Sequence, residues 1–279
     1  MKHYVSLTKP RIALMVAMTA GLGWALAGGR ATPTFWLMLL GVSVASAASG
    51  TLNQYVERRE DGLMKRTMRR PLPLGKVKAE SALAFGLALA LIGPAIVWAS
   101  VGRLAGGLTA ATIAMYVLAY TPLKKITPQT TWIGAAAGAM PPLIGWAAYA
   151  GALSPKAWAL FGIQFLWQIP HFLALFWIYR EEYAAAGFKT MPVVHPDGGT
   201  TAVQIALHCF TLLPMTLLPV VLGMAGLPYA FAALAVGTVF LGFGLRASWT
   251  MAVVDARRLF LASLAYLPLI FGMLYFGGV

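Results

Sequence analysis

Long apolar runs, joined by short polar connections, dominate the pattern of the chain. A helix needs about 20 apolar residues to cross the hydrocarbon core of a bilayer. Runs of about that length lie at residues 12–29, 35–55, 80–100, 103–121, 131–151, 157–178, 201–224, 227–246 and 257–277. None has the alternating pattern of an outer-membrane barrel strand. The pattern predicts an all-α integral membrane protein with nine transmembrane helices, formed by one polytopic domain over residues 1–279.

The composition agrees with a membrane protein. Hydrophobic residues make up 59% of the chain and charged residues only 10%, and the mean hydropathy is +0.75. A soluble domain carries about 25% charged residues. The single cysteine, Cys209, lies inside an apolar run, which excludes a disulfide within the chain and indicates a small buried hydrophobic side chain.

The positions of the basic residues predict the orientation. Cytoplasmic loops of membrane proteins carry an excess of Lys and Arg. With the N-terminus in the cytoplasm, all 21 Lys and Arg residues fall in cytoplasmic segments except Arg30, Arg103 and Lys156. Nine spans then put the C-terminus outside.

The net charge of +13 follows from this orientation and from attraction to anionic lipid, so we expect no nucleic-acid partner. Residues 2–27 resemble a signal peptide, but the eight later runs favour a first helix that is retained. The short N-terminus without a transit peptide favours the cytoplasmic (inner) membrane of a prokaryote.

The second apolar run ends in SGTLNQYVERRED, in which Asn53, Glu57 and Asp61 recur at steps of four. If the helix continues past the membrane surface, each step turns about 400° and rises about 6 Å, so the three side chains form one stripe. Mg²⁺ prefers one or two carboxylates together with water and substrate phosphate oxygens. The stripe is therefore a candidate site for a divalent cation.

Basic residues follow this stripe and suit a polyanion: Lys65, Arg66, Arg69 and Arg70. An arginine can bind phosphate through two N–H groups at once. The alternative is a solvated loop, in which pairs such as Asp61 with Lys65 support a helix and the arginines set the topology. The spacing alone does not decide between the two interpretations.

The fourth run ends in YTPLKK, where Tyr120 and Lys124 are four positions apart. A phenol and an ammonium group at a membrane surface can bind a leaving phosphate. Tyr and Lys are also the ordinary anchors of a helix at that surface. Taken alone, the pair favours the simpler role of an anchor.

The sixth run contains His171, and an ionisable residue inside an apolar run is a functional hypothesis by default. On a continuous helix, Tyr179 would lie about 80° and Glu182 about 20° from His171, so all three could face one cavity. The alternative is a neutral His171 that binds a backbone carbonyl freed by Pro170.

The second, fourth and sixth runs end on the same predicted face, and polar residues suited to a diphosphate follow each of them. A site shared by these loops would lie at the cytoplasmic mouth of the helix bundle. An oily tail could then lie among the helices while the charged head stays near water. The predicted substrate is an isoprenoid diphosphate.

These residues resemble the intramembrane aromatic prenyltransferase superfamily, whose members form nine helices around a central lipid-open cavity. The stretches that carry the resemblance are LTKPRI at 7–12, LNQYVERREDGLMKRTMRRPLP at 52–73, TPQTTWIGAAAGAMPPLIGWAA at 127–148, FLWQIPHFLALFWIYREEYAAAGFKTMPVV at 165–194 and ARRLFLASLAYLPLIF at 256–271. Glu57 stands where quinone-making members usually carry Asp, and it favours the branch that modifies haem. Glu182 departs from the Asp that is more usual there.

The resemblance implies transfer of a farnesyl group from farnesyl diphosphate to a vinyl group of haem B, with addition of water, to give haem O. It also implies that Mg²⁺ assists departure of the diphosphate. The assignments are Asn53, Glu57 and Asp61 as metal ligands and, with Lys124 and Glu182, as catalytic residues; Lys65, Arg66, Arg70, Tyr120 and Lys124 at the diphosphate; Tyr55, Tyr120 and Trp167 as shields of an allylic cation; and His171 at the haem.

Three other functions remain open at this point, of which a purely structural membrane subunit leaves the carboxylate stripe unexplained. A related enzyme would prenylate a phenolic quinone precursor with the same fold and diphosphate site. A transporter would show inverted repeats with helices broken near the midplane, and only the Gly/Pro-rich stretch at 134–145 points that way. The resemblance alone implies a partner that modifies haem or assembles an oxidase.

Overall fold

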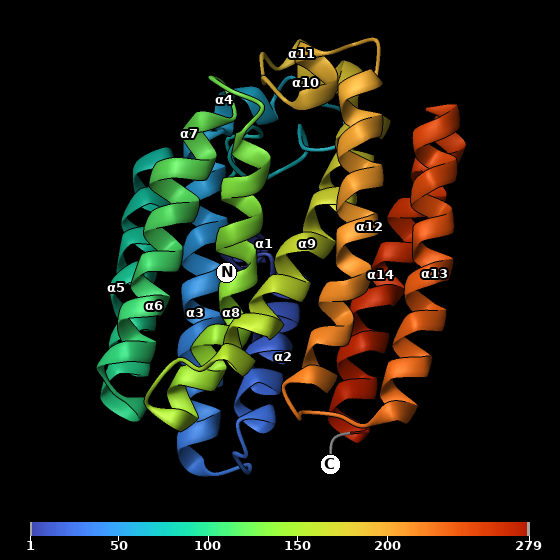
Figure 1. Cartoon of the computed structure of the whole chain (residues 1–279). Helices are drawn as coiled ribbons and strands as arrows, with labels where there is room; N and C mark the ends of the chain where they lie inside the picture. The colour runs from blue at the N-terminus through green and yellow to red at the C-terminus, as the bar shows by residue number, and fades with distance from the viewer. Residues whose placement is uncertain (1, 278–279) are drawn as a thin grey trace.

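The computed structural model describes residues 2–277, and this part of the chain consists of helices and connections without strands (Figure 1). The long helices are α2 (Pro10–Leu26), α3 (Pro33–Val56), α5 (Ala79–Val101), α6 (Arg103–Ala114), α8 (Thr130–Ala150), α9 (Pro155–Ile178), α12 (Gly199–Val221), α13 (Leu227–Thr250) and α14 (Val253–Phe276). Helix α6 continues through a π-helical turn, η1 (Met115–Tyr120), into α7 (Thr121–Leu123). The other short helices are α1 (Lys2–Leu7), α4 (Arg58–Asp61), α10 (Arg180–Ala185) and α11 (Met191–Val194).

A helix lies at each predicted run, and within residues 2–277 seven helical segments are long and apolar enough to cross a membrane. These are α3, α5, the segment from α6 to α7, α9, α12, α13 and α14. The multi-pass, all-α class is thereby confirmed. Helix α2 has only 17 residues, and α8 is not among the seven. Nine spans, a single domain and the orientation of the termini stay predictions.

Helix α8 packs against its neighbours through small residues. It lies against α2, α6 and α9, and most of its side chains are buried. A Cβ atom on Gly145 would lie 1.8 Å from the carbonyl oxygen of Ala20, and one on Gly23 would lie 2.1 Å from that of Pro142. Small residues let helices approach closely where lipid provides no hydrophobic driving force. The glycines therefore allow α2 and α8 to pack closely.

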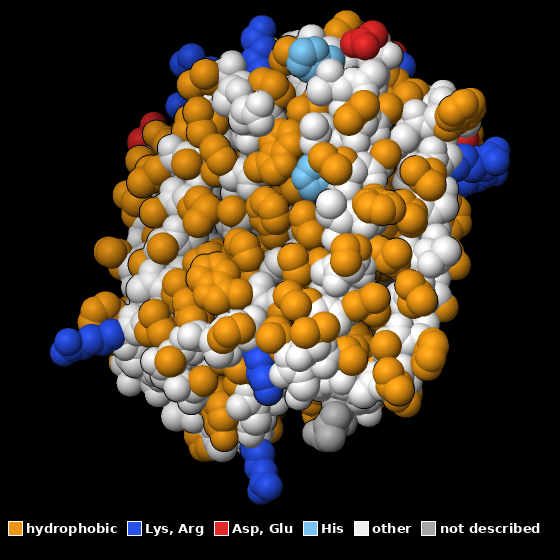
Figure 2. Space-filling model, viewed as in Figure 1, with side chains coloured by type: hydrophobic (Ala, Val, Ile, Leu, Met, Phe, Trp, Pro, Cys, Tyr) orange, Lys and Arg blue, Asp and Glu red, His pale blue; other side chains and the backbone are white. Residues whose placement is uncertain are grey.

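The short helices mark one end of the molecule. Figure 1 shows α4, α7, α10 and α11 together at the top of the bundle, beyond the ends of α3 and α9. In Figure 2 the charged side chains gather toward the two ends, and the broad band between them shows hydrophobic side chains, uncharged white atoms and one histidine on this face. The candidate polar residues therefore lie at the edge of the apolar band.

A separate acid–base cluster closes the connection between α13 and α14. The Asp255 carboxylate accepts hydrogen bonds from Arg246 Nε (3.1 Å), Arg258 (2.9 Å) and Thr250 Oγ1 (2.9 Å). The side chains of Arg246 and Arg258 are 63% and 53% exposed. This cluster lets the chain reverse direction within two residues at the membrane surface.

Candidate functional site

The three candidate metal ligands follow one almost continuous helical path. The Glu57 N–H donates to the Asn53 carbonyl (2.9 Å), and the Asp61 N–H donates to the Glu57 carbonyl (2.8 Å), although α3 ends at Val56. Asn53, Glu57 and Asp61 are 2%, 4% and 0% exposed. Carboxylates are almost never buried this far unless they are paired. The alternative of a solvated loop is therefore wrong for these residues.

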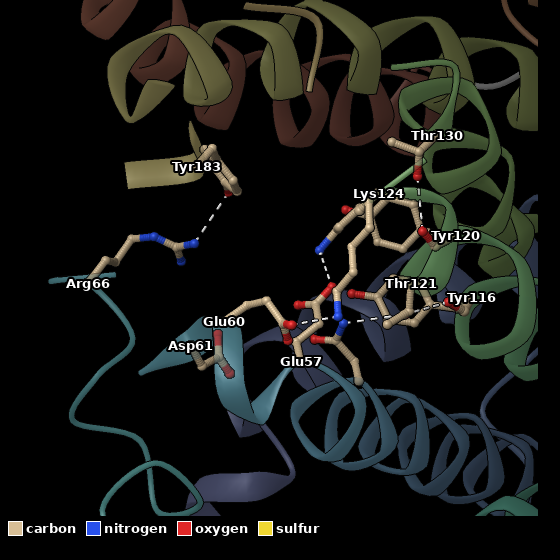
Figure 3. Close-up of polar contacts among 12 residues, drawn as sticks. Glu57, Glu60, Asp61, Arg66, Tyr116, Tyr120, Thr121, Lys124, Thr130 and Tyr183 are labelled. Atoms are coloured by element: carbon tan, nitrogen blue, oxygen red, sulfur yellow. Dashed lines mark hydrogen bonds and ion pairs between the residues drawn. The ribbon is translucent and has the colours of Figure 1, made fainter. Parts of the chain in front are cut away.

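Each of the two buried carboxylates is paired with a basic side chain. Lys124 Nζ donates to Glu57 Oε1 at 2.8 Å, as Figure 3 shows. One guanidinium nitrogen of Arg70 donates to both carboxylate oxygens of Asp61, at 2.7 and 2.8 Å. Asp61 is thus bound to Arg70 and not to Lys65, the partner that the loop alternative proposed.

Burial and charge shift the pKa values of this cluster in different directions. Burial lowers the pKa of Lys124, but the Glu57 carboxylate outweighs it and the pKa stands well above its ordinary value. Burial raises the pKa of Asp61, while the guanidinium of Arg70 opposes that shift. Lys124 therefore stays cationic at neutral pH and can pair with another anion if Glu57 turns elsewhere.

Lys9 is a third basic side chain in the cluster, and the sequence analysis assigned it no role. Its Nζ donates to Asn53 Oδ1 at 3.0 Å. Its backbone is left-handed (φ 49°, ψ 61°) at the residue before Pro10, a conformation that costs about 1–3 kcal/mol outside glycine. Burial lowers the pKa of Lys9 to about 7, and the nearby Arg70 cation adds to the shift. The sequence signal that could have identified Lys9 was its position as a basic residue directly before the first long helix.

The π-helical turn η1 places two tyrosines beside Lys124. The ring centroids of Tyr116 and Tyr120 are 5.0 Å apart, and Lys124 Nζ lies 4.7 Å from the Tyr120 centroid. Gly134 makes room for the Tyr120 ring, because a Cβ there would lie 2.5 Å from it. Tyr120 and Lys124 are 6% and 8% exposed, so both lie deeper than surface anchors. The sequence analysis missed Tyr116, because nothing in the pattern predicted a π-turn.

The segment after α9 closes over the same cluster. Glu182 Oε2 accepts from the backbone N–H of Arg66 (3.2 Å), and the Arg66 guanidinium donates to the Tyr183 hydroxyl (3.3 Å; Figure 3). The backbone N–H of Lys189 donates to the Lys124 carbonyl (2.6 Å). A small hydrophobic cluster joins the two loops: Met64, Phe176, Tyr183, Ala186 and Phe188. The polar segments after α3, α7 and α9 therefore meet.

Not every candidate residue joins this cluster. Lys65 is exposed and forms no ion pair within the described part of the chain. Tyr55 packs against the hydrophobic cluster around Leu7 and Leu72 and lies under the Arg58 guanidinium. The Glu182 carboxylate contacts the Arg66 backbone and none of the three residues of the stripe.

The prediction that His171, Tyr179 and Glu182 share one helical face is wrong. Helix α9 ends at Ile178, and Tyr179 (φ −109°, ψ 21°) separates it from α10. The chain changes direction there, so the angle between His171 and Glu182 no longer follows from their spacing. Neither a proline nor a glycine marks this break in the sequence.

His171 faces α14. Its Nδ1 lies 2.7 Å from Ser263 Oγ. The imidazole ring stacks with Trp167 and with Phe260, with centroid distances of 5.2 and 4.8 Å. Its partner is therefore a serine hydroxyl, and the suggested bond to a carbonyl freed by Pro170 is not formed.

The donor groups of the stripe fit Mg²⁺ in kind. Residues 2–277 contain no group of three or more His, Cys, Asp or Glu side chains placed to hold a metal by themselves. One amide oxygen and two carboxylates are present instead, on Asn53, Glu57 and Asp61. Mg²⁺ commonly binds one or two carboxylates and completes its shell with water and substrate phosphate. The site suits a metal shared with a diphosphate.

The chain is similar to known proteins along almost its whole length. The model of the UbiA prenyltransferase family matches residues 13–273. "Protoheme IX farnesyltransferase" of Solibacter usitatus is 42% identical over 287 residues, which cover 98% of this chain and 98% of that protein. The protein of the same name from Koribacter versatilis is 38% identical and covers 98% of this chain and 92% of its own.

Solved structures share the fold at low sequence identity. A structure of digeranylgeranylglyceryl phosphate synthase matches with a TM-score of 0.84 at 16% identity, covering 99% of this chain and 97% of that one. A UbiA homologue from Archaeoglobus fulgidus, bound to DMAPP and Mg²⁺, matches with a TM-score of 0.68 at 14% identity, covering 98% and 99%.

Proposed function

The chain belongs to the UbiA prenyltransferase family, and from this we propose that it transfers the farnesyl group of farnesyl diphosphate to a vinyl group of haem B, forming haem O. The buried cluster of two carboxylates and three basic side chains at the ends of α3 and α7 carries the proposal. Relatives named protoheme IX farnesyltransferase, which match nearly the whole chain, support haem as the acceptor.

Asn53, Glu57 and Asp61 would hold Mg²⁺, because one amide oxygen and two carboxylates lie together on a single buried stripe. When bound, Mg²⁺ would neutralise charge that develops on the departing diphosphate. Lys124 and Arg70 are the cations paired with the two carboxylates. Arg66 and Tyr120 complete the diphosphate-binding set. Lys65 is its weakest member, because its exposed side chain has no hydrogen bond or ion pair with a described residue, whereas Arg66 donates to Tyr183.

Substrate binding requires the buried ion pairs to exchange partners. Lys124 donates to Glu57 and Arg70 to Asp61, so the same four side chains cannot serve metal and phosphate unchanged. Mg²⁺ would replace the cations at the carboxylates, and phosphate oxygens would replace the carboxylates at the cations. Each buried charge then keeps an opposite charge, and the desolvation cost of an unpaired ion is avoided.

The site must exclude water until the new carbon–carbon bond has formed. The bond between farnesyl C1 and the diphosphate oxygen breaks, and its electron pair leaves with the diphosphate. The vinyl π electrons form the new carbon–carbon bond, and water adds to the resulting cation with loss of a proton. An allylic cation reacts with any nearby water. The rings of Tyr120 and Phe188, 4.7 and 5.5 Å from Lys124 Nζ, suit the shielding of such a cation.

The distribution of Lys and Arg supports a cytoplasmic position for this site in a prokaryotic inner membrane. A polar mouth at the edge of the apolar band would let the farnesyl tail lie among the helices. Haem and farnesyl diphosphate are then the substrates, membrane lipid surrounds the protein, and a haem-modifying or oxidase-assembly protein would receive the product.

The test is an assay of the full chain in detergent with haem B, farnesyl diphosphate and Mg²⁺, with the haem followed by mass spectrometry. We expect a mass gain of one farnesyl group plus one hydroxyl group. Asp61→Asn and Glu57→Gln should reduce this gain to a small fraction of the wild-type value. Asp255→Asn is the matched control, because it changes a carboxylate at the α13–α14 connection, and it should retain the gain.

Two outcomes would contradict the proposal. Prenylation of a phenolic quinone precursor, with no change in haem, would retain the diphosphate site and reject the haem acceptor. Full activity of both the Asp61→Asn and Glu57→Gln variants would reject the assignment of the stripe, whatever the acceptor.

A further inference from the structure

Two histidines lie within helices long and apolar enough to cross the membrane: His171 in α9 and His208 in α12. The other two histidines, His3 and His195, lie in α1 and in the connection after α11. A charged side chain is costly inside a membrane, so we treat both intramembrane imidazoles as neutral. A neutral imidazole has one N–H donor and one nitrogen lone pair.

The hydroxyl of Ser263 determines which nitrogen of His171 carries the proton. Ser263 Oγ donates its single hydrogen to the Phe260 carbonyl, at 2.5 Å. The same oxygen lies 2.7 Å from His171 Nδ1 and has no second hydrogen to give. His171 must therefore donate from Nδ1, and its lone pair is on Nε2.

The contacts of the ring restrict the orientation of this lone pair. Trp167 and Phe260 both stack with the imidazole, with interplanar angles of 26° and 29°. Trp167 Nε1 also donates to the Ser263 carbonyl at 2.8 Å. Ser263 is fully buried, so its backbone and its hydroxyl both hold the ring against α14. Rotation of the ring would break these contacts.

His208 has the same tautomer but uses its lone pair. Its Nδ1 lies 2.8 Å from the Gln204 carbonyl, which can only accept, so Nδ1 carries the proton. Its Nε2 accepts a hydrogen bond from Trp132 Nε1 at 3.3 Å. Both nitrogens of His208 are satisfied, and the residue needs no further partner.

His171 Nε2, in contrast, has no hydrogen bond to any residue in the described part of the chain. This nitrogen is not one of the fully buried polar atoms without a hydrogen bond, so part of its surface is accessible from outside the protein. Aromatic contacts connect the ring to the diphosphate site, running from His171 through Phe172, Phe176 and Tyr183 to Phe188. An accessible nitrogen lone pair of fixed orientation thus lies within the apolar part of the bundle.

We propose that His171 Nε2 binds the iron of the haem substrate and that Ser263 is the positioning residue that holds His171 in this tautomer. The inference rests on the proposed function. The imidazole contributes an electron pair to a dative bond with iron and loses no proton, because Nδ1–H stays bound to Ser263. Histidines that bind metals generally donate their other N–H to such a partner, and imidazole is a common axial ligand of haem iron.

The test is a titration of the full chain with haem B, without farnesyl diphosphate, followed by visible absorption and by the iron–histidine stretch of the ferrous complex. The wild type should show an imidazole-bound haem. His171→Ala should lose the iron–histidine band, and added imidazole should restore it. Ser263→Ala should shift the band and weaken haem binding about tenfold or more. Ser263→Thr keeps a hydroxyl and should restore both.

His208→Ala is the matched control, since it removes an intramembrane imidazole whose lone pair is already used, and it should leave the spectrum unchanged. An unchanged band in His171→Ala would overturn iron binding by this residue. A wild-type spectrum and affinity in Ser263→Ala would overturn the positioning role of the hydroxyl.

The mass assay separates these failures from failure of the proposed function. If the wild type forms haem O while His171→Ala retains the iron–histidine band, only this inference fails. If the wild type farnesylates another acceptor and neither converts nor binds haem, the proposed function fails, and this inference fails with it.

Discussion

Two regions of the molecule combine aspartate with arginine, but only one has the environment of a functional site. Asp61 is fully buried, and its partner Arg70 has a side chain only 24% exposed. Asp255 is also buried, but Arg246 and Arg258 extend into the surroundings. Asp255 binds cations that remain largely solvated, whereas Asp61 and Glu57 bind cations that have lost much of their water.

The difference lies in what each cluster can do when a new ion arrives. Solvated pairs contribute little, and a competing anion gains little by replacing them. Buried pairs are held together partly because neither ion can remain alone. A ligand that brings both a cation and an anion can satisfy all of these charges together. The buried cluster is therefore suited to bind a metal diphosphate, and the Asp255 cluster is suited to hold a turn.

Removal of divalent metal should give the largest effect. A metal ion contributes several kcal/mol to transition-state stabilisation, so we expect excess chelator to lower the transfer rate by at least about a thousandfold. The thermal unfolding temperature should change little, because Lys124 and Arg70 already balance the carboxylates. Mg²⁺ added back should restore the rate. Unchanged turnover in metal-free buffer would show that the carboxylates do not act through a metal.

Asp61→Asn should lower the transfer rate by about 10²–10³-fold, the range found when one group that stabilises a transition state electrostatically is removed. The change retains the shape of the side chain and removes only its charge. The measurement is kcat by mass spectrometry, with haem affinity as the control. A loss of haem affinity with unchanged kcat would place Asp61 at the acceptor and not at the diphosphate.

Lys124→Gln should lower both activity and stability. It leaves the Glu57 carboxylate buried without its partner, which costs about 3–5 kcal/mol. The double variant Lys124→Gln, Glu57→Gln removes both charges and should recover most of the unfolding temperature, but no activity. Recovery of activity in the double variant would show that the pair serves only the fold.

Lys9→Gly should lower activity by about tenfold or more, because a hydrogen bond from a charged group contributes about 1.5–3 kcal/mol. The unfolding temperature should change little, since relief of the left-handed strain at this position, about 1–3 kcal/mol, offsets the lost hydrogen bond to Asn53. Lys9→Gln is the matched control, which keeps the strain and removes the charge. Equal activity of wild type and both variants would exclude Lys9 from the site.

Asp255→Asn should have the smallest effect on chemistry, with the transfer rate changed by less than about twofold, as is usual for substitutions away from a site. A modest fall in the unfolding temperature is expected, because the carboxylate accepts three hydrogen bonds at the α13–α14 connection. A rate loss as large as that of Asp61→Asn would remove the distinction between the two clusters.

The sequence predicted the helices well because apolar length is a local property. It also predicted the Asn53–Glu57–Asp61 stripe, since steps of four stay aligned wherever the backbone bonds run from residue i to i+4. The partners of these residues were less predictable. Arg70 was only one of several basic candidates, and its bond to Asp61 depends on the path of the loop between them.

Features that depend on distant segments could not be predicted. The bond between His171 and Ser263 joins positions 92 residues apart. The break at Tyr179 has no proline or glycine to mark it. Pro122 follows the π-turn and cannot donate a backbone bond to residue 118, but a proline by itself does not predict a π-turn. Lys9 joins the cluster because its own left-handed backbone turns the chain between α1 and α2.

The contacts between distant loops also determine when the site exists during synthesis. Lys9 bonds to Asn53 across 44 positions and Lys124 to Glu57 across 67, but Arg66 bonds to Tyr183 across 117. Membrane helices leave the ribosome in order, so the closing segment after α9 arrives only when well over half of the chain has been made. A nascent chain that stalls earlier lacks this cover. The carboxylates, Lys9 and Lys124 are then already present, but the segment that covers them is not.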